Sequence, residues 1–239
     1  WASEPGNADG DLMRLLAINP NTSDSVSALI RAEAERSASH GTSVEVVTAP
    51  FGVAYIETRF EALIGAYAAA LLAAEHHERF DAVIVAAFGD PGLAGLREAL
   101  PIPVTGMTEA AMASACLLGH RFSIVAITQR IRSWYRETVE ANMLSARLAS
   151  IRALDEPLAD IATVQADQGD RLLPLAERCA DEDGAGVIVL AAAPLAGLAR
   201  SLAGRLPVPA VAGVSSAVRH AETLVRLGAG RARRGSFAP

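Results

Sequence analysis

The sequence predicts an α/β protein of two pseudo-symmetric lobes, each a parallel sheet of about four strands flanked by helices. Apolar runs rich in β-branched residues alternate with helical patterns along the chain, which is typical of parallel sheets covered on both faces. One unit also occurs twice, as DAVIVAAFGDPGLAGLREALP at 81–101 and as AGVIVLAAAPLAGLARSLAGRLP at 185–207. The offset of roughly 105 residues is too long for a solenoid and suits a duplicated lobe.

Periodicity gives the elements in order. The near-continuous apolar runs predict strands at 13–18, 43–48, 81–86, 102–105, 121–127, 149–153, 186–190 and 208–211. Apolar residues at helical spacing predict helices at roughly 23–38, 57–78, 92–99, 107–118, 130–146, 157–182, 195–203 and 214–227.

The repeat extends beyond its central match. Residues 15–23 align with 123–131, and 100–115 align with 206–221 after one extra residue. We therefore expect an N-terminal lobe at 13–106 and a C-terminal lobe at 107–212. The last helix, at 213–228, is expected to pack back on the first lobe, and residues 1–12 form an N-terminal extension. A duplicated strand–turn–helix unit brings two equivalent helix starts together, so the active site is expected between the lobes.

Composition narrows the class of partner. The chain of 239 residues has a formal net charge of -6, which argues against nucleic acid or an anionic membrane as a partner. The sequence contains no apolar run long enough to cross a bilayer, and residues 1–12 lack a signal-peptide pattern. The two cysteines, Cys116 and Cys179, both fall in helical patterns. A disulfide framework is not indicated, and a reducing cytoplasm is the expected location.

Three turns have a composition suited to binding, because ligands gather at the carboxyl ends of parallel strands. The first is NPNTS at 19–23, where Asn21, Thr22 or Ser23 can cap the next helix and free N–H groups can hold a carboxylate or imide oxygen. Asn19 ends the strand before it. Simple N-capping is an equally good explanation of so short a motif.

The second turn is AAFGDPGL at 86–93, which contains Phe88. Gly89 and Gly92 permit a positive φ, and Asp90 is expected to cap a helix that begins at Pro91. A well-made strand-to-helix turn is the alternative interpretation.

The third turn is AAAPLAGL at 191–198. Pro194, after Ala193, again suits the first position of a helix, and the side chains are smaller than in the second turn. Thr128 ends the equivalent of the first strand and can either bind a ligand or cap a helix. Tyr55 lies in a loop beside the expected site, as a lid or as a packed aromatic residue.

Motifs for other chemistries are missing from the sequence. It contains no phosphate-binding loop of Walker or Rossmann spacing, no G-x-S-x-G elbow and no HExxH. The histidines at 76, 77 and 120 have no metal-ligand spacing. We therefore expect neither a metal nor a cofactor.

NPNTS after the first strand, FGDPGL after the third, EAAM at 109–112 and PLAGL in the second lobe together resemble the aspartate/glutamate/hydantoin racemase superfamily. The hydantoin and allantoin racemases are the branch that the sequence resembles most, from Met13 to about Leu227. The resemblance implies a cofactor-independent isomerase, a homo-oligomer, that acts on a small molecule such as a cyclic imide, a ureide or a small carboxylic acid.

The resemblance also implies a mechanism. In this family one cysteine from each lobe faces the stereocentre; one thiolate removes the Cα proton and the opposite thiol returns a proton to the other face. Thiol pKa values near ~8.5, lowered at helix N-termini, suit both tasks. Here the two family positions hold Ala87 and Ala192, and alanine exchanges no proton. An active site with intact binding turns and impaired proton transfer is therefore expected.

Alanine at these two positions has several explanations. The alanines can be engineered replacements, natural divergence, or a mixture of both in a branch that uses a single cysteine. One-cysteine relatives such as the arylmalonate decarboxylases protonate one face only, so a decarboxylase of malonate-like acids is the second hypothesis. A non-catalytic protein that binds a small acid or imide is the third.

Overall fold

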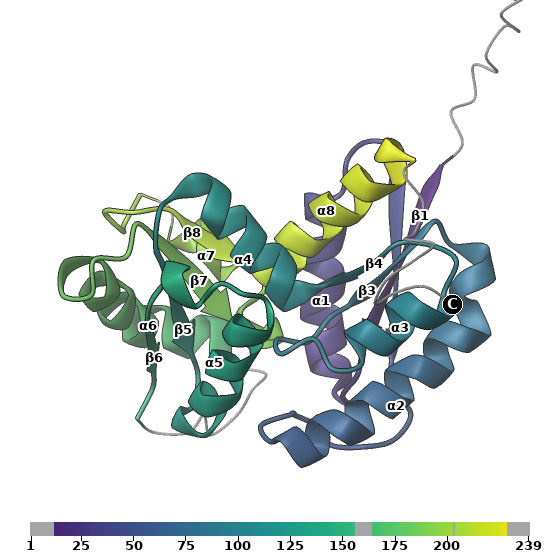
Figure 1. The fold of residues 1–239 in the computed structure, drawn as a ribbon, viewed down its shortest axis with the longest axis horizontal. Coiled ribbons are helices and arrows are strands. Elements are labelled where there is room, and N and C mark those ends of the chain that lie inside the picture. Colours follow the sequence, from purple (N-terminus) through teal and green to yellow (C-terminus); the bar gives the residue numbers. More distant parts are fainter. Residues whose placement is uncertain (1–11, 156–163, 203, 229–239) are drawn as a thin grey trace, which may run out of the picture.

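The computed structural model describes residues 12–155, 164–202 and 204–228, which form two four-stranded parallel sheets. The first sheet has the order β2-β1-β3-β4, with β1 at Met13–Asn19, β2 at Thr42–Thr48, β3 at Ala82–Val85 and β4 at Val104–Gly106. The second has the order β6-β5-β7-β8, with β5 at Phe122–Ala126, β6 at Leu148–Ala153, β7 at Val187–Ala191 and β8 at Ala210–Ala212. The identical strand order confirms the predicted fold class and its internal symmetry (Figure 1).

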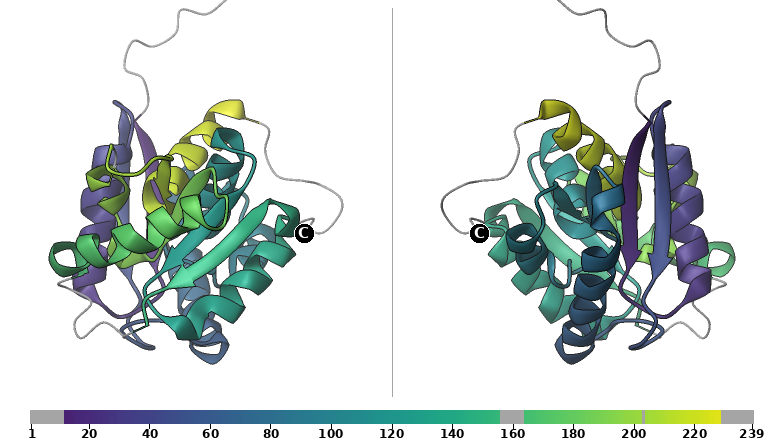
Figure 2. Two further views of the ribbon diagram at one scale, coloured as in Figure 1. Left: turned by 90° about the vertical axis from the view of Figure 1, so that its left-hand side faces the viewer. Right: turned by 90° about the vertical axis from the view of Figure 1, so that its right-hand side faces the viewer.

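Helices cover these sheets. The α-helices are α1 (Asp24–Ser37), α2 (Arg59–His76), α3 (Leu93–Ala99), α4 (Met107–Leu118), α5 (Arg132–Ala141), α6 (Val164–Asp181), α7 (Leu198–Ser201) and α8 (Gly213–Leu227). Short 3₁₀ turns are η1 (His77–Arg79), η2 (Gln129–Ile131), η3 (Ser145–Arg147) and η4 (Ala193–Leu195). In Figure 2, α1 and α2 lie on opposite faces of the first sheet, which explains why its inner strands are apolar on both sides.

The helix that follows each edge strand packs against the other sheet. α4 follows β4 of the first sheet and contacts β7 of the second, whereas α8 follows β8 and contacts α1 and β3 of the first (Figure 1). The two helices also pack on each other at their starts, where a Cβ added to Gly213 would lie 2.2 Å from Cγ of Met107. Glycine at this position therefore allows the close approach of α4 and α8.

Two predicted helices differ from the observed ones. The predicted helix at 130–146 is a 3₁₀ turn followed by α5, which ends at Ala141 where the chain turns through Met143 at a φ of 57°. The predicted helix at 195–203 is reduced to the four residues of α7, because Gly197 interrupts it at a φ of 87°. Part of the predicted helix at 157–182 and nearly all of the N-terminal extension at 1–12 lie outside the described residues.

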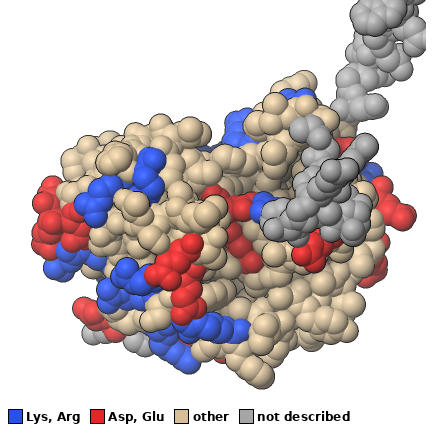
Figure 3. All heavy atoms as spheres, viewed as in Figure 1, with Lys and Arg blue, Asp and Glu red and all other residues tan. Residues whose placement is uncertain are grey.

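No described helix is both long and apolar enough to span a membrane. On the face shown in Figure 3, basic and acidic side chains lie beside one another and form no single basic field.

Candidate active site between the lobes

A small cavity lies at the carboxyl ends of the central strands of both sheets. It has a volume of about 20 Å³, and its lining residues come from the turns after β1, β3 and β7, the loop after β2, and α5. These residues are Asn21, Tyr55, Ile56, Ala87, Phe88, Tyr135, Ala192 and Ala193. The fold therefore brings five of the sequence-predicted site residues together: Asn21, Ala87, Phe88, Ala192 and Ala193.

Ala87 and Ala192 occupy equivalent turns in the two lobes. The carbonyl of Ala87 accepts a hydrogen bond from the N–H of Asp90 at 3.2 Å, and that of Ala192 accepts one from Leu195 at 3.0 Å. The two alanines are 7% and 3% exposed, and both line the same cavity. The repeat in the sequence thus becomes two matching turns that meet at one site.

The NPNTS segment is organised by its first asparagine. Asn19 is fully buried, and its Nδ2 donates to Oδ1 of Asn21 at 3.0 Å and to Oγ of Ser27 at 2.9 Å. Ser23 caps α1 by accepting a hydrogen bond from Val26 N–H, as one of the capping alternatives predicted. Thr22 donates its N–H to the carbonyl of Val53 at 2.9 Å, which ties this turn to the loop that carries Tyr55.

The side-chain amide of Asn21 is oriented by its neighbours. Its Oδ1 accepts from Asn19 Nδ2 and from Ser23 N–H, both at 3.0 Å, so the oxygen is committed to the protein. Its Nδ2 donates to no group in the described part of the chain, although Asn21 is only 3% exposed. Thr42 Oγ1 is the fully buried side-chain atom without a partner among the described residues, so Asn21 Nδ2 is open to the cavity and can donate to a ligand or a water there. Asn21 is therefore suited to bind a ligand oxygen at the cavity.

Backbone N–H groups supply further hydrogen-bond donors beside the side-chain amide of Asn21. Within 12–155, 164–202 and 204–228, the N–H groups of Ala87, Phe88 and Ala192 have no hydrogen-bond acceptor. All three residues line the cavity. Several N–H donors around one small space are suited to hold the carbonyl oxygens of a ligand and to stabilise negative charge that develops on them.

Two tyrosines complete the lining. The rings of Phe88 and Tyr135 lie 4.7 Å apart, and the Tyr135 hydroxyl donates to the carbonyl of Ala191 at 3.5 Å. Burial raises the pKa of Tyr135 well above its ordinary value, and burial followed by the charge of Glu57 raises that of Tyr55. Both phenols are therefore neutral donors near pH 7 and are not bases.

The sequence pattern predicts Tyr55 beside the site but does not identify Ile56 or Tyr135. Tyr135 could have been recognised as buried from its spacing of four residues from Ile131 and from Val139 on α5. The direction in which this face of α5 packs depends on the tertiary fold, so the sequence pattern could not connect it to the cavity.

The expected role of Asp90 as the cap of its own helix is wrong. α3 begins at Leu93 after Gly92, which has a φ of 80°, so Pro91 precedes the helix as well. The Asp90 carboxylate instead accepts the N–H groups of Thr108 at 2.8 Å and Glu109 at 2.9 Å, in the first turn of α4. Burial raises the pKa of this carboxyl group to about 7, although these two bonds act in the opposite direction.

The remaining predicted site residues do not line the cavity. Gly89 has the expected positive φ, 103°, and its N–H donates to Oγ1 of Thr108 at 2.5 Å. Thr128 is 6% exposed and caps η2 by accepting from the N–H of Arg130, so the capping interpretation holds for it. Pro194 is the second residue of η4 and is buried. The lining also excludes four residues whose hydrogen bonds hold the segments around the cavity: Asn19, Thr22, Ser23 and Asp90.

Neither cysteine reaches the cavity. Cys179 on α6 is fully buried, and burial raises the pKa of its thiol. Cys116 on α4 is half-buried. Among the described residues, no group of three His, Cys, Asp or Glu side chains could hold a metal ion.

Known proteins resemble this chain along nearly its whole length. The family model for Asp/Glu/hydantoin racemases matches residues 15–221. A hydantoin racemase of Paenarthrobacter aurescens is 35% identical over 221 residues, which cover 90% of this chain and 92% of that protein. A second hydantoin racemase, from Pseudomonas sp. (strain NS671), is 31% identical and covers 90% of this chain and 87% of its own length.

Solved structures extend the similarity to three dimensions. An allantoin racemase from Pseudomonas fluorescens has a TM-score of 0.89 at 35% identity, covering 95% of this chain and 97% of that one. The allantoin racemase from Klebsiella pneumoniae has a TM-score of 0.87 at 34% identity, with coverage of 95% and 94%. An arylmalonate decarboxylase, at 16% identity and a TM-score of 0.63 with coverage of 95% and 97%, shares the fold alone. The chain therefore belongs to the Asp/Glu/hydantoin racemase family, whose named reactions are isomerisations.

Proposed function

We propose that this protein is a cofactor-independent isomerase of the hydantoin or allantoin racemase type, with alanine at both positions that carry protons in this family. The observation that supports this most is the meeting of Ala87 and Ala192 at one cavity surrounded by unpaired N–H donors. The similarity to hydantoin and allantoin racemases along nine-tenths of the chain favours a cyclic ureide or imide as the ligand. Because the cavity of about 20 Å³ holds little more than one water, binding of this ligand requires the lining turns to move apart, and the chain as it stands is expected to racemise it poorly.

The proposed binding mode follows from the donors. A hydantoin ring carries two carbonyl oxygens and a stereocentre next to one of them. Asn21 Nδ2 and the N–H groups of Phe88 and Ala192 would bind these oxygens. Removal of the ring proton places negative charge on the neighbouring oxygen, and donors that are already in position stabilise that enolate. In this proposal the hydrogen-bond donors that stabilise the enolate are retained.

The proton-transfer half needs a base and an acid on opposite sides of the stereocentre. Residues 87 and 192 lie in the turns that follow equivalent strands of the two lobes, β3 and β7, so side chains at these positions would approach a ligand from different lobes. The two neutral tyrosines of the lining cannot replace a thiolate, because their pKa values are raised. We therefore assign the proposed loss of activity to these two methyl groups.

The experiment restores the thiols. Ala87→Cys, Ala192→Cys and the double variant are purified, and loss of optical rotation is followed for an enantiopure 5-substituted hydantoin and for allantoin. The double variant should racemise at least one of them, and each single variant should remain near the rate of the unchanged chain. A folded double variant that racemises neither, nor aspartate or glutamate, contradicts the proposal.

Two further measurements separate the alternatives. Release of carbon dioxide from an arylmalonate by either single variant would favour a decarboxylase over a racemase. Thermal stabilisation of the unchanged chain by a hydantoin, without turnover, is expected for an intact binding site. Turnover by the unchanged chain at the rate of the double variant would show that the thiols are not the missing groups.

We also propose that the protein self-associates and works in the cytoplasm. The exposed face of α2 carries Phe60, Leu63 and Tyr67, which are 72%, 70% and 61% exposed, and such a row favours a protein interface. The unpaired thiols of Cys116 and Cys179 suit a reducing compartment. Sedimentation velocity at several concentrations tests the first point; a monomer throughout would contradict it.

A further inference from the structure

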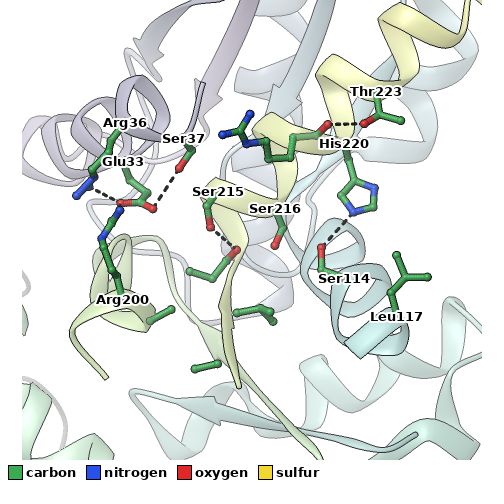
Figure 4. Close-up of a pocket in the computed structure, with 15 residues that line it drawn as sticks. Glu33, Arg36, Ser37, Ser114, Leu117, Arg200, Ser215, Ser216, His220 and Thr223 are labelled. Atoms are coloured by element: carbon green, nitrogen blue, oxygen red, sulfur yellow. Dashed lines mark hydrogen bonds and ion pairs between the residues drawn. The ribbon is translucent and has the colours of Figure 1, made fainter. Parts of the chain in front are cut away.

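A second and much larger groove crosses the junction between the lobes. It has a volume of about 700 Å³, and it shares no lining residue with the cavity described above. Its walls come from α1 of the first lobe, from α4 and α8, and from α7 and β8 of the second lobe (Figure 4). A groove of this size is large enough for a metabolite.

One end of the groove is cationic. The buried carboxylate of Glu33 contacts both Arg36 of α1 and Arg200 of α7, the latter at 2.7 Å. Two guanidinium groups share a single carboxylate there, so one positive charge is not neutralised. Both arginines are about half-exposed, at 47% and 50%, and keep N–H donors for another partner.

The α8 side of the groove adds further donors. Arg219 uses its Nη1 to contact Ser39 and Glu222, while its Nε and Nη2 have no acceptor in the part of the chain that the structure describes. His220 lies beside it in the sequence, and its Nε2 is 3.1 Å from Oγ of Ser114. The groove therefore has cationic groups on both sides, in a chain whose formal net charge is -6.

Ser216 adds a hydroxyl that is available to a ligand in the groove. It lies between the two sides of the groove in Figure 4 and is only 8% exposed, yet its hydroxyl makes no hydrogen bond to any described residue. The other serines that line the groove, Ser37, Ser114 and Ser215, all have a partner. Thr42 Oγ1 is the fully buried side-chain atom without a partner among the described residues, so the Ser216 Oγ is open to the groove, where a bound group or water can accept its hydrogen bond.

The apolar side chains that line the groove favour an organic anion over an inorganic one. Leu117, Ala199 and Val211 line the same groove and offer contacts for a carbon skeleton, which an inorganic ion does not have. We propose that this groove is a binding site for a small organic carboxylate, held by Arg36, Arg200 and Arg219 and by the hydroxyl of Ser216. The proposal does not depend on the function of the smaller cavity.

Isothermal titration of the full chain with succinate tests this site, at constant ionic strength. Succinate should bind, whereas its neutral amide analogue succinamide should not. Ser216→Ala and Arg219→Gln should each weaken succinate binding at least about tenfold, because a hydrogen bond to a charged group is lost. Ser216→Ala removes no internal hydrogen bond, so it remains a valid test if Arg219→Gln perturbs folding.

Matched controls lie outside the groove. Arg226→Gln removes the same charge from the same helix, and Ser145→Ala removes an exposed hydroxyl; both should leave the affinity within about twofold. Absence of succinate binding, equal binding of inorganic phosphate or succinamide, or insensitivity to Ser216→Ala would each overturn the proposal. Insensitivity to Ser216→Ala would place any bound succinate elsewhere on the protein.

Discussion

Asp90 acts on a helix other than the one that follows it. Its φ of 48° is a left-handed conformation, which aspartate tolerates better than most residues, and it directs the carboxylate to the start of α4. The Gly89 N–H contacts Thr108 in the same turn of α4. The FGDPGL segment thus fixes the position of α4 relative to the turn that carries Ala87.

Replacement of Asp90 by asparagine tests this contact. Asparagine adopts the same φ but offers one oxygen where two N–H groups need acceptors, so the free energy of unfolding should fall by about 1 kcal/mol. Urea denaturation at pH 7 measures the change. Asp24→Asn at an exposed position of α1 is the matched control and should have a smaller effect. Equal stability of Asp90→Asn and the unchanged chain would contradict the capping role.

At the scale of elements, α8 is fastened to the first lobe by a buried carboxylate. Glu222 is 1% exposed and accepts from the N–H of Ser39 at 2.7 Å and from its hydroxyl at 2.8 Å, just beyond the end of α1. Burial acts to raise the pKa of Glu222, but the Ser39 bonds and the charge of Arg219 outweigh burial and leave the pKa below its ordinary value.

Glu222→Gln should therefore destabilise the protein in a pH-dependent way. A carboxyl group whose folded pKa is lowered contributes stability above its unfolded pKa, near 4.5, and loses it as the pH falls through the folded pKa. At pH 7 the variant should lose about 1–3 kcal/mol of unfolding free energy, and the gap should close below about pH 4. Glu35→Gln, at an exposed site on α1, should show no such pattern. A gap independent of pH would contradict the account.

The sequence predicts the strands of this protein more accurately than its short helices. The apolar strands were predictable to within about two residues, because a strand buried on both faces leaves a continuous apolar run. The helix at 195–203 was overestimated since local propensity does not reveal that Gly197 adopts a positive φ. At the site, the repeat located the turns of Ala87 and Ala192, but the contribution of Tyr135 depends on how α5 packs.

The whole molecule is held together by two exchanged helices. α4 leaves the first sheet to contact the second, α8 does the reverse, and the two helices pack on each other. A lobe that unfolded alone would expose the partner surfaces of both helices. The lobes should therefore unfold as one cooperative unit.

Equilibrium unfolding in urea tests this cooperativity. In a Trp1→Phe variant, the fluorescence of Trp134 reports on α5 and on its contact with the Gly89 turn of the first lobe, while far-ultraviolet circular dichroism reports on the helices and strands of both lobes. The two midpoints should coincide. A fluorescence midpoint clearly separated from the dichroism midpoint would show that the lobes unfold independently.

The central claim is that positions 87 and 192 are the two proton-carrying positions of an otherwise intact racemase site. Proton NMR in deuterium oxide tests it most directly, by following the ring proton of an enantiopure 5-substituted hydantoin. The account predicts that the Ala87→Cys/Ala192→Cys variant replaces this proton with deuterium as it forms the opposite enantiomer, well above the background rate given by the unchanged chain. Exchange no faster than that background, in a folded double variant that binds the hydantoin, would contradict it.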